Sequence, residues 1–169
     1  PQFSEAVTLT GHIVDSLILT RVMDAVMDNG GNFDVESIKI GRHKDEISNA
    51  RLMIFADTQA QLDHILEILQ DLGAELASGG DVQTQPAPRD GVLPDDFYST
   101  TNLATQVRID GLWVEVSLIE MDVVIVVDRA ARTARCVPMN ETKAGVPVVV
   151  GHAGIRVIPL ERSREREIF

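Results

Sequence analysis

The sequence predicts an α+β protein with a ferredoxin-like (split βαβ) N-terminal half, followed by a mainly antiparallel β half. Two observations support this fold class. Up to residue 77, segments with the two-residue alternation of strands take turns with segments whose apolar residues recur at helical spacing. From residue 92 onward the pattern is almost entirely two-residue, with turn residues between short apolar runs.

The first half, residues 1–77, is expected to follow the order β-α-β-β-α-β, which gives an antiparallel sheet with two helices on one face. Strands are predicted at 6–10, 33–40 (with a bend near Glu36 and Ser37), 51–56 and 74–77, and helices at 17–29 and 58–72. Ser16 is the expected N-cap of the first helix and Gly30-Gly31 its left-handed stop. Thr58 and Gln61 form a capping-box pair at the start of the second.

Residues 78–91 are glycine, proline and polar residues with hardly any apolar side chains, which predicts a linker or an extended edge segment. After it, residues 92–169 are expected to form a small β-rich half, either a sandwich or a barrel-like sheet. Its strands are predicted on both sides of residues 110–111 and at 121–127, 134–139, 146–150 and 155–158.

The dipeptide Asp110-Gly111 between two alternating apolar runs indicates a tight hairpin. A two-residue turn there places Ile109 opposite Leu112 and Val107 opposite Val114. It also places Arg108 and Trp113 on the other face of the hairpin, where they are expected to form a cation–π pair.

Composition argues against several function classes. The net charge is -11, from 15 Lys+Arg and 26 Asp+Glu, and no basic stripe compensates for it, so nucleic acid is not an expected partner. The longest apolar run, 123–127, is far shorter than the ~20 residues of a membrane helix, and no signal-peptide pattern is present, so no membrane partner is expected. The single cysteine, Cys136, fits the cytoplasm and is expected to be a buried apolar thiol.

No motif supplies a self-sufficient catalytic site, and the catalytic residues are unknown. A glycine-rich phosphate-binding turn is lacking, so this chain is not expected to hold NAD or another cofactor. The four histidines lie far apart, without the spacing of metal ligands, so no metal is expected. His64 is expected to be solvated. Asp122 enters a predicted buried strand and needs a partner if it is buried.

Two segments gather polar groups that suit a small-molecule ligand. In the first, His12, Asp15 and Ser16 flank the start of the first predicted helix, where free N–H groups suit an anion such as a carboxylate. An ordinary capping turn is the alternative for this segment.

The second segment is Pro94–Asn102, between the predicted linker and the hairpin. Its candidate ligand-binding residues are Asp95, Asp96, Tyr98, Thr100, Thr101 and Asn102. Such a cluster binds an ammonium group or another polar ligand. Equally, it can be a loop that satisfies its own backbone while its aromatic residues anchor it to the core.

These residues resemble the LOR/SDH bifunctional-enzyme conserved domain. The likeness covers nearly the whole chain and is carried by residues 11–16, 28–33, 90–102, 121–127 and 148–151, of which 94–102 are the most specific. The chain is similar to part of cyanobacterial arginine dihydrolase/ornithine cyclodeaminase proteins and to part of archaeal-type ornithine cyclodeaminases. The resemblance implies that an NAD-binding region follows this domain in the parent enzyme and that the catalytic residues lie outside this chain.

Three functional hypotheses follow. The first is an accessory domain of an arginine/ornithine or lysine catabolic enzyme, inactive alone, which packs beside an NAD-binding domain of the parent or a partner chain and shapes the amino-acid pocket or the oligomer. The second is a free-standing ACT-like amino-acid-binding regulatory module. The third is an enzyme with its site at 95–102. A homo-oligomer is expected because helices cover only one face of the predicted sheet. The ends of the chain suggest a domain of a longer polypeptide, or processing of a short protein.

Overall fold

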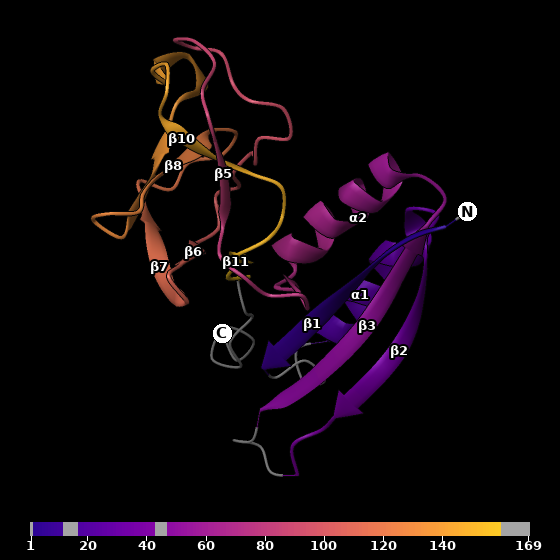
Figure 1. Ribbon diagram of the computed structural model, residues 1–169. Helices are drawn as coiled ribbons and strands as arrows, with labels where there is room; N and C mark the ends of the chain where they lie inside the picture. Colours follow the sequence, from indigo (N-terminus) through magenta and orange to yellow (C-terminus); the bar gives the residue numbers. More distant parts are fainter. Residues whose placement is uncertain (1, 12–16, 43–46, 160–169) are drawn as a thin grey trace, which may run out of the picture. The chain divides into compact units, whose positions relative to one another are not determined.

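The structure, a computed structural model, describes residues 2–11, 17–42 and 47–159. Over these ranges the protein is mixed α+β, mostly strand with two α-helices, in agreement with the predicted class. Its contacts divide it into two units (Figure 1). The first contains the residues up to Ser78 and takes in the chain again from Ile158, and the second is Gly79–Val157.

The first unit is a four-stranded antiparallel sheet with two helices. Its elements are β1 (Phe3–Gly11), α1 (Ile18–Asp28), β2 (Asn32–Lys39), β3 (Ser48–Ala56), α2 (Gln59–Asp71) and β4 (Glu75–Leu76). Across the sheet the strands lie in the order β2-β3-β1-β4, and every neighbouring pair is antiparallel. All six predicted elements are present. The third strand begins three residues earlier than predicted, at Ser48.

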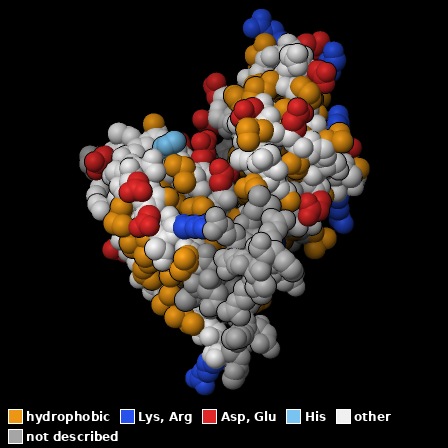
Figure 2. Space-filling model, turned by 180° about the vertical axis from the view of Figure 1, so that it is seen from behind, with side chains coloured by type: hydrophobic (Ala, Val, Ile, Leu, Met, Phe, Trp, Pro, Cys, Tyr) orange, Lys and Arg blue, Asp and Glu red, His pale blue; other side chains and the backbone are white. Residues whose placement is uncertain are grey.

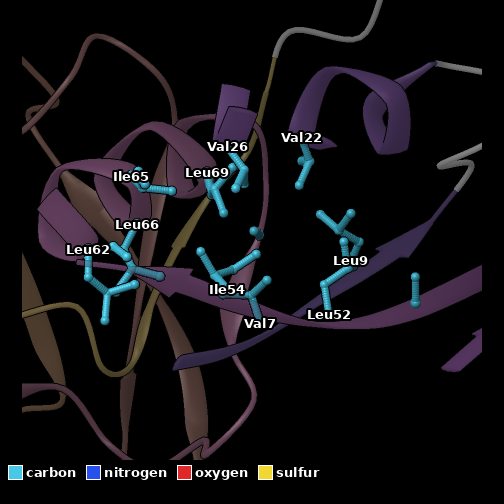
Figure 3. Close-up of a cluster of buried hydrophobic side chains, with 13 residues drawn as sticks. Val7, Leu9, Val22, Val26, Leu52, Ile54, Leu62, Ile65, Leu66 and Leu69 are labelled. Atoms are coloured by element: carbon cyan, nitrogen blue, oxygen red, sulfur yellow. The ribbon is translucent and has the colours of Figure 1, made fainter. Parts of the chain in front are cut away.

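Both helices share one core with one face of the sheet, as Figure 3 shows. Along β3 every second residue is buried, which directs Leu52 and Ile54 toward Val26 of α1 and Ile65 of α2. The buried residues of this core are Val7, Leu9, Val22, Val26, Ala50, Leu52, Ile54, Ala56, Leu62, Ile65, Leu66, Leu69 and Ala74. Burying a large aliphatic side chain contributes roughly 1.5–3 kcal/mol, so this face holds the unit together.

The start of α1 differs from the prediction, and its end agrees with it. The N-cap position is taken by Leu17, which has φ 62° and no side-chain cap bond, and the predicted cap Ser16 lies outside the described residues. At the other end Gly30 has φ 79°, and the Gly31 N–H donates to the Val26 carbonyl at 2.9 Å. The left-handed glycine therefore ends the helix, as predicted.

The predicted capping pair of α2 is confirmed. The Thr58 hydroxyl accepts from the Gln61 N–H at 3.1 Å, and Gln61 Oε1 accepts in return from the Asp57 N–H at 3.1 Å. Gln61 Nε2 also donates to the Asn29 carbonyl at 2.9 Å, at the end of α1. One side chain thus caps its own helix and ties it to the other.

The second unit is a seven-stranded sheet. Its elements are β5 (Gln83–Pro86), β6 (Thr105–Ile109), β7 (Leu112–Ser117), β8 (Val124–Asp128), β9 (Thr133–Val137), the 3₁₀ turn η1 (Met139–Glu141), β10 (Pro147–Val150) and β11 (Ile155–Val157). The strand order is β11-β6-β7-β9-β8-β10-β5. Only the β7–β9 pair is parallel among these neighbours, so the mainly antiparallel character agrees with the prediction.

The second sheet curls around its own core. Buried residues of β6, β8, β10 and β11, among them Val107, Ile125 and Val149, belong to one cluster. Val82, just before β5, donates its N–H to the Arg108 carbonyl of β6 at 2.9 Å, so the β5 end of the sheet returns toward β6. Of the two predicted forms, the barrel-like sheet matches this single continuous sheet. Residues 83–86, within the predicted linker or extended segment, form β5 beside β10.

The predicted register of the β6–β7 hairpin is confirmed, with Val107 opposite Val114 and Ile109 opposite Leu112. The predicted cation–π pair is wrong in one partner. The guanidinium of Arg156, from β11 on the far side of β6, lies 4.0 Å from the centroid of the Trp113 ring. Arg108 instead lies near a carboxylate outside the hairpin, described below.

Candidate functional site

The polar stretch 94–102 is pinned to the second sheet by its backbone. The Tyr98 N–H donates to the Val149 carbonyl of β10 at 2.9 Å, and the Gly151 N–H donates to the Asp96 carbonyl at 2.9 Å. Pro94 and Tyr98 are buried, the latter 6% exposed. These contacts fix residues 96–98 along the end of β10.

Thr100 is the most heavily bonded residue of this stretch. It is 2% exposed, and its hydroxyl lies 2.5 Å from the Glu120 carbonyl and 3.1 Å from the Val123 carbonyl. The same oxygen accepts from the Val123 N–H at 3.1 Å. The Thr100 N–H also donates to the Val123 carbonyl, and the Thr100 carbonyl accepts from the Asp122 N–H, both at 2.9 Å. Thr100 therefore holds the turn that leads into β8.

The other candidate residues of the stretch divide by exposure. Asp95, Asp96 and Asn102 are exposed, and Asp96 has φ 59°, in the left-handed region that Asp and Asn tolerate better than most residues. Thr101 is half-buried, and its hydroxyl accepts from the Leu103 N–H at 3.2 Å. The structure thus places three polar side chains at the surface, beside an anchored and buried pair, Tyr98 and Thr100.

The remaining sequence candidates do not join this group. His12, Asp15 and Ser16 lie outside the described residues. Asp122 is exposed with φ 60°, so it is not the buried acid that would need a partner, and β8 begins two residues later. His64 is exposed on α2 as expected.

Cys136 is buried at 5% exposure, as predicted. Burial raises the pKa of its thiol, which keeps it protonated and unreactive at neutral pH. Within residues 2–11, 17–42 and 47–159, no three His, Cys, Asp or Glu side chains are grouped so that they could hold a metal. No helix in the same ranges is long and apolar enough to cross a membrane.

A groove of about 530 Å³ opens on the second unit, and the sequence did not point to it. Its lining is Thr84, Val126, Val127, Asp128, Arg129, Arg135, Val146 and Pro147. Val126 and Val127 are buried, whereas Arg129 and Arg135 are exposed. Arg129 Nη2 already donates to the Val82 carbonyl at 2.7 Å, and Asp128 brings a carboxylate to the same lining, so the groove combines charges of both signs beside an apolar floor. Arg135 lies there because β8 and β9 pair it with Val126, and Arg129 directly follows β8, an arrangement that composition cannot reveal.

A second feature missed by the sequence lies at the hairpin turn. The Asp81 carboxylate accepts the N–H groups of Asp110 at 2.8 Å and Gly111 at 2.9 Å. These bonds, with Arg108 4.0 Å away and the charge of Arg129, hold the pKa of Asp81 below its usual value. Asp81 therefore acts as a charged cap on the turn.

On the face drawn in Figure 2, basic side chains lie apart, with acidic ones among them.

The described strand-to-helix turn does not fit a dinucleotide. Between β3 and α2 it consists of Asp57 and Thr58, with no glycine, and the Thr58 hydroxyl already occupies the Gln61 N–H. A pyrophosphate needs free N–H groups and a close backbone approach at such a turn.

Comparison with known proteins gives two family matches that together span the chain. Residues 4–103 match the LOR/SDH bifunctional enzyme conserved region, and residues 104–169 match the first C-terminal region of arginine dihydrolases like ArgZ. The boundary at 103 lies inside the second structural unit, after the 94–102 stretch.

Among curated relatives, the ornithine cyclodeaminase of Methanothermobacter thermautotrophicus is 50% identical over 161 residues, which is 95% of this chain and 39% of the relative. The bifunctional arginine dihydrolase/ornithine cyclodeaminase AgrE of Nostoc sp. is 35% identical over 96% of this chain and 24% of its own length. The chain thus spans about two fifths or less of these relatives.

Solved structures agree in fold. The structure of AgrE with ornithine and NAD+ superposes with a TM-score of 0.83 at 33% identity, covering 99% of this chain and 25% of that one. The structure of apo ArgZ, a cyanobacterial arginine dihydrolase, gives 0.85 at 34% identity, over 93% and 25%. The chain therefore belongs to the LOR/SDH bifunctional-enzyme conserved-region family.

Proposed function

We propose that this chain is an accessory domain of an ornithine cyclodeaminase-type enzyme, inactive alone and packed beside an NAD-dependent domain in the cytoplasm. One observation carries the proposal. The similarity covers 95% of this chain but only 39% of the ornithine cyclodeaminase relative. The ornithine and NAD+ complex belongs to a relative four times as long, which supports assigning the cofactor to the remainder of such an enzyme. A role in oligomerisation is part of the proposal.

The finer fold of the first unit is a ferredoxin-like, split βαβ sandwich. The strand order β2-β3-β1-β4 and the shared core of α1 and α2 on one face support it. This fold hosts many unrelated functions, so it does not decide between an accessory domain and a regulatory module.

Asp95, Asp96 and Asn102 are proposed as the ligand-facing groups of this domain. Their exposure supports this role, as does the anchoring of Tyr98 and Thr100 beside them. Two carboxylates and an amide suit the ammonium group of an amino acid. Anchored neighbours would hold the backbone of these groups in place and so lower the entropy cost of ordering them when the ligand binds.

A domain exchange tests the accessory role. This chain should replace the matching 161 residues of the Methanothermobacter ornithine cyclodeaminase with retention of cyclodeaminase activity, whereas the chain alone should have none and should not bind NAD in calorimetry. Turnover of ornithine by the chain alone would refute the proposal.

The same chimera tests the loop. Asp95→Asn, Asp96→Asn and Asn102→Ala together should lower kcat/KM for ornithine, while the free energy of unfolding of the isolated chain changes by less than about 0.5 kcal/mol. Asp96→Asn is chosen because Asn keeps the preference for the left-handed region. Ser99→Ala, exposed in the same loop, is the control. Unchanged kinetics would remove these three residues from the candidate site.

A further inference from the structure

The outer edge of β2 stands out among the sheet edges. Four strands lie at the edges of the two sheets, and β2 is the longest of them, with eight residues. The others are β4 with two residues, β11 with three, and β5 with four, ending in Pro86. Short strands and proline are the usual protections of a sheet edge. Within the part of the chain that the structure describes, no strand pairs with the outer side of β2 (Figure 1).

Exposed apolar side chains follow this edge. Val35 and Ile38 lie opposite Leu52 and Ala50 of β3, which places them on the helix-bearing face. They are nevertheless 42% and 46% exposed, and Ile40, next in the alternation, is 58% exposed. Two large β-branched residues on an unpaired edge, with a third directly after the end of β2, favour burial against another strand.

Opposite charges lie on the other face of the same strand. Asp34 and Lys39 are both exposed and lie opposite Met53 and Asn49 of β3. The residues next to Met53 and Asn49 point to the core, so Met53, Asn49 and their partners on β2 point away from it. In a regular strand, residues five apart point to opposite faces. Here they share a face because the register shifts between Val35 and Ser37, where Glu36 is the extra residue.

We propose that β2 pairs antiparallel with β2 of a second copy of this chain, about a two-fold axis between Glu36 and Ser37. In this register, residues that lie opposite one another point to the same face of the joined sheet, on both sides of the axis. It places Asp34 opposite Lys39, Val35 opposite Ile38 and Phe33 opposite Ile40, each pair occurring twice. Opposite charges and apolar pairs directly across antiparallel strands stabilise the pairing.

The bulge is compatible with pairing to a second copy. A regular strand can pair on both sides of Glu36 where the bulge sets two residues of β2 against one of the partner, as β3 does with Leu52 opposite Val35 and Arg51 opposite Ser37. A strand with the same extra residue, run in the opposite direction, also matches on both sides, and a second copy of β2 in addition sets Asp34 opposite Lys39 on each side of the axis. Glu36 comes near its own copy at the axis, and its carboxylate is already paired with Arg51 Nε at 2.7 Å.

Charge reversal tests this register by size-exclusion chromatography with light scattering. The wild-type chain should give twice the 18.5 kDa of one chain at high concentration. Asp34→Lys and Lys39→Asp each bring like charges together twice and should weaken the dimer by at least about tenfold. An equimolar mixture of the two variants should regain the dimer, because every pair again joins opposite charges. Asp24→Lys, exposed on α1, is the control and should dimerise like the wild type.

Circular dichroism first establishes that each variant is folded. A wild-type monomer, variants that dimerise like the wild type, or a mixture that stays monomeric would each overturn the proposal. The dimer proposal extends the oligomeric part of the proposed function, but its test needs no activity assay. A failed domain exchange and a failed dimer are therefore separate results.

Discussion

Thr100 shows how one hydroxyl can decide the structure of a polar loop. Its oxygen contacts the Glu120 and Val123 carbonyls and accepts the Val123 N–H, all in a buried position. Thr100→Val keeps the shape and leaves these groups without their partner. We expect a loss of about 1–3 kcal/mol in the free energy of unfolding, measured with urea and the fluorescence of Trp113. Ser99→Ala, which is exposed, should change it by less than about 0.5 kcal/mol. Equal stability of the two variants would contradict this role.

The same residue marks the limit of the sequence analysis at the loop. The polar residues of the stretch 94–102 indicate either a ligand-binding site or a loop whose side chains bond its own backbone, and the sequence does not decide between them. Thr100 and Thr101 are identical in type and adjacent, yet one is 2% exposed and bonds across the sheet, while the other bonds two residues along the chain. That difference depends on residues 120–123, which the local pattern does not place.

Asp81 should give the second unit a pH-dependent contribution to stability. Its pKa is lowered in the folded state by the N–H groups of Gly111 and Asp110 and by nearby arginines. A folded pKa below the unfolded value of about 3.9 means that the contribution is complete at neutral pH and is lost as the pH falls through the folded pKa. Asp81→Asn should therefore lower Tm at pH 7, and the gap to the wild type should close below about pH 4. A gap that stays constant with pH would show that the charge is not involved.

At the scale of elements, the turn between β10 and β11 offers a matched pair of glycines. Gly151 and Gly154 have φ values of 68° and 69°, so an added Cβ is strained equally at both. A Cβ at Gly151 meets nothing within 4 Å, whereas one at Gly154 lies 2.6 Å from the Asp81 carbonyl carbon and closer still to the Val82 nitrogen.

Gly151→Ala should therefore cost about 1–2 kcal/mol from the left-handed backbone alone. Gly154→Ala should cost about 1–3 kcal/mol more, because the backbone before β5 must move away. Urea unfolding followed by Trp113 fluorescence measures both variants in the same unit. Equal losses would mean that the close approach of residues 81–82 to this turn does not constrain it.

Elements whose defining contacts are local were predictable. The turn Asp110-Gly111 sets the register of β6 and β7, and Thr58 with Gln61 sets the start of α2, because both partners lie within a few residues. The predicted bend of β2 near Glu36 also appears, as the register shift.

Contacts between distant strands were not predictable. Arg156 reaches Trp113 because β11 lies beside β6, and Arg129 and Arg135 share a groove because β8 pairs with β9. Alternation of apolar residues shows which face of a strand is buried, but it does not give the order of seven strands in a sheet. The groove was therefore missed, although its arginines are plain in the sequence.

At the scale of the whole molecule, the two units have separate cores. The cluster around Ile54 draws on the first unit alone, and the clusters around Ile125 and Val124 draw on the second alone. The spectroscopic probes divide in the same way. Both α-helices of the described residues lie in the first unit, and the single tryptophan of the sequence, Trp113, lies in the second. Far-UV circular dichroism of helix thus reports one unit, and fluorescence reports the other.

Separate cores predict that the two units lose stability independently. Ile54→Ala should remove about 2–5 kcal/mol from the first unit, and Ile125→Ala a similar amount from the second, because both side chains are fully buried. In urea, Ile54→Ala should move the circular-dichroism transition to lower denaturant and leave the fluorescence transition nearly in place, and Ile125→Ala should do the reverse. If either change moved both transitions together, the chain would unfold as one cooperative body, and the division into two units would not extend to its stability.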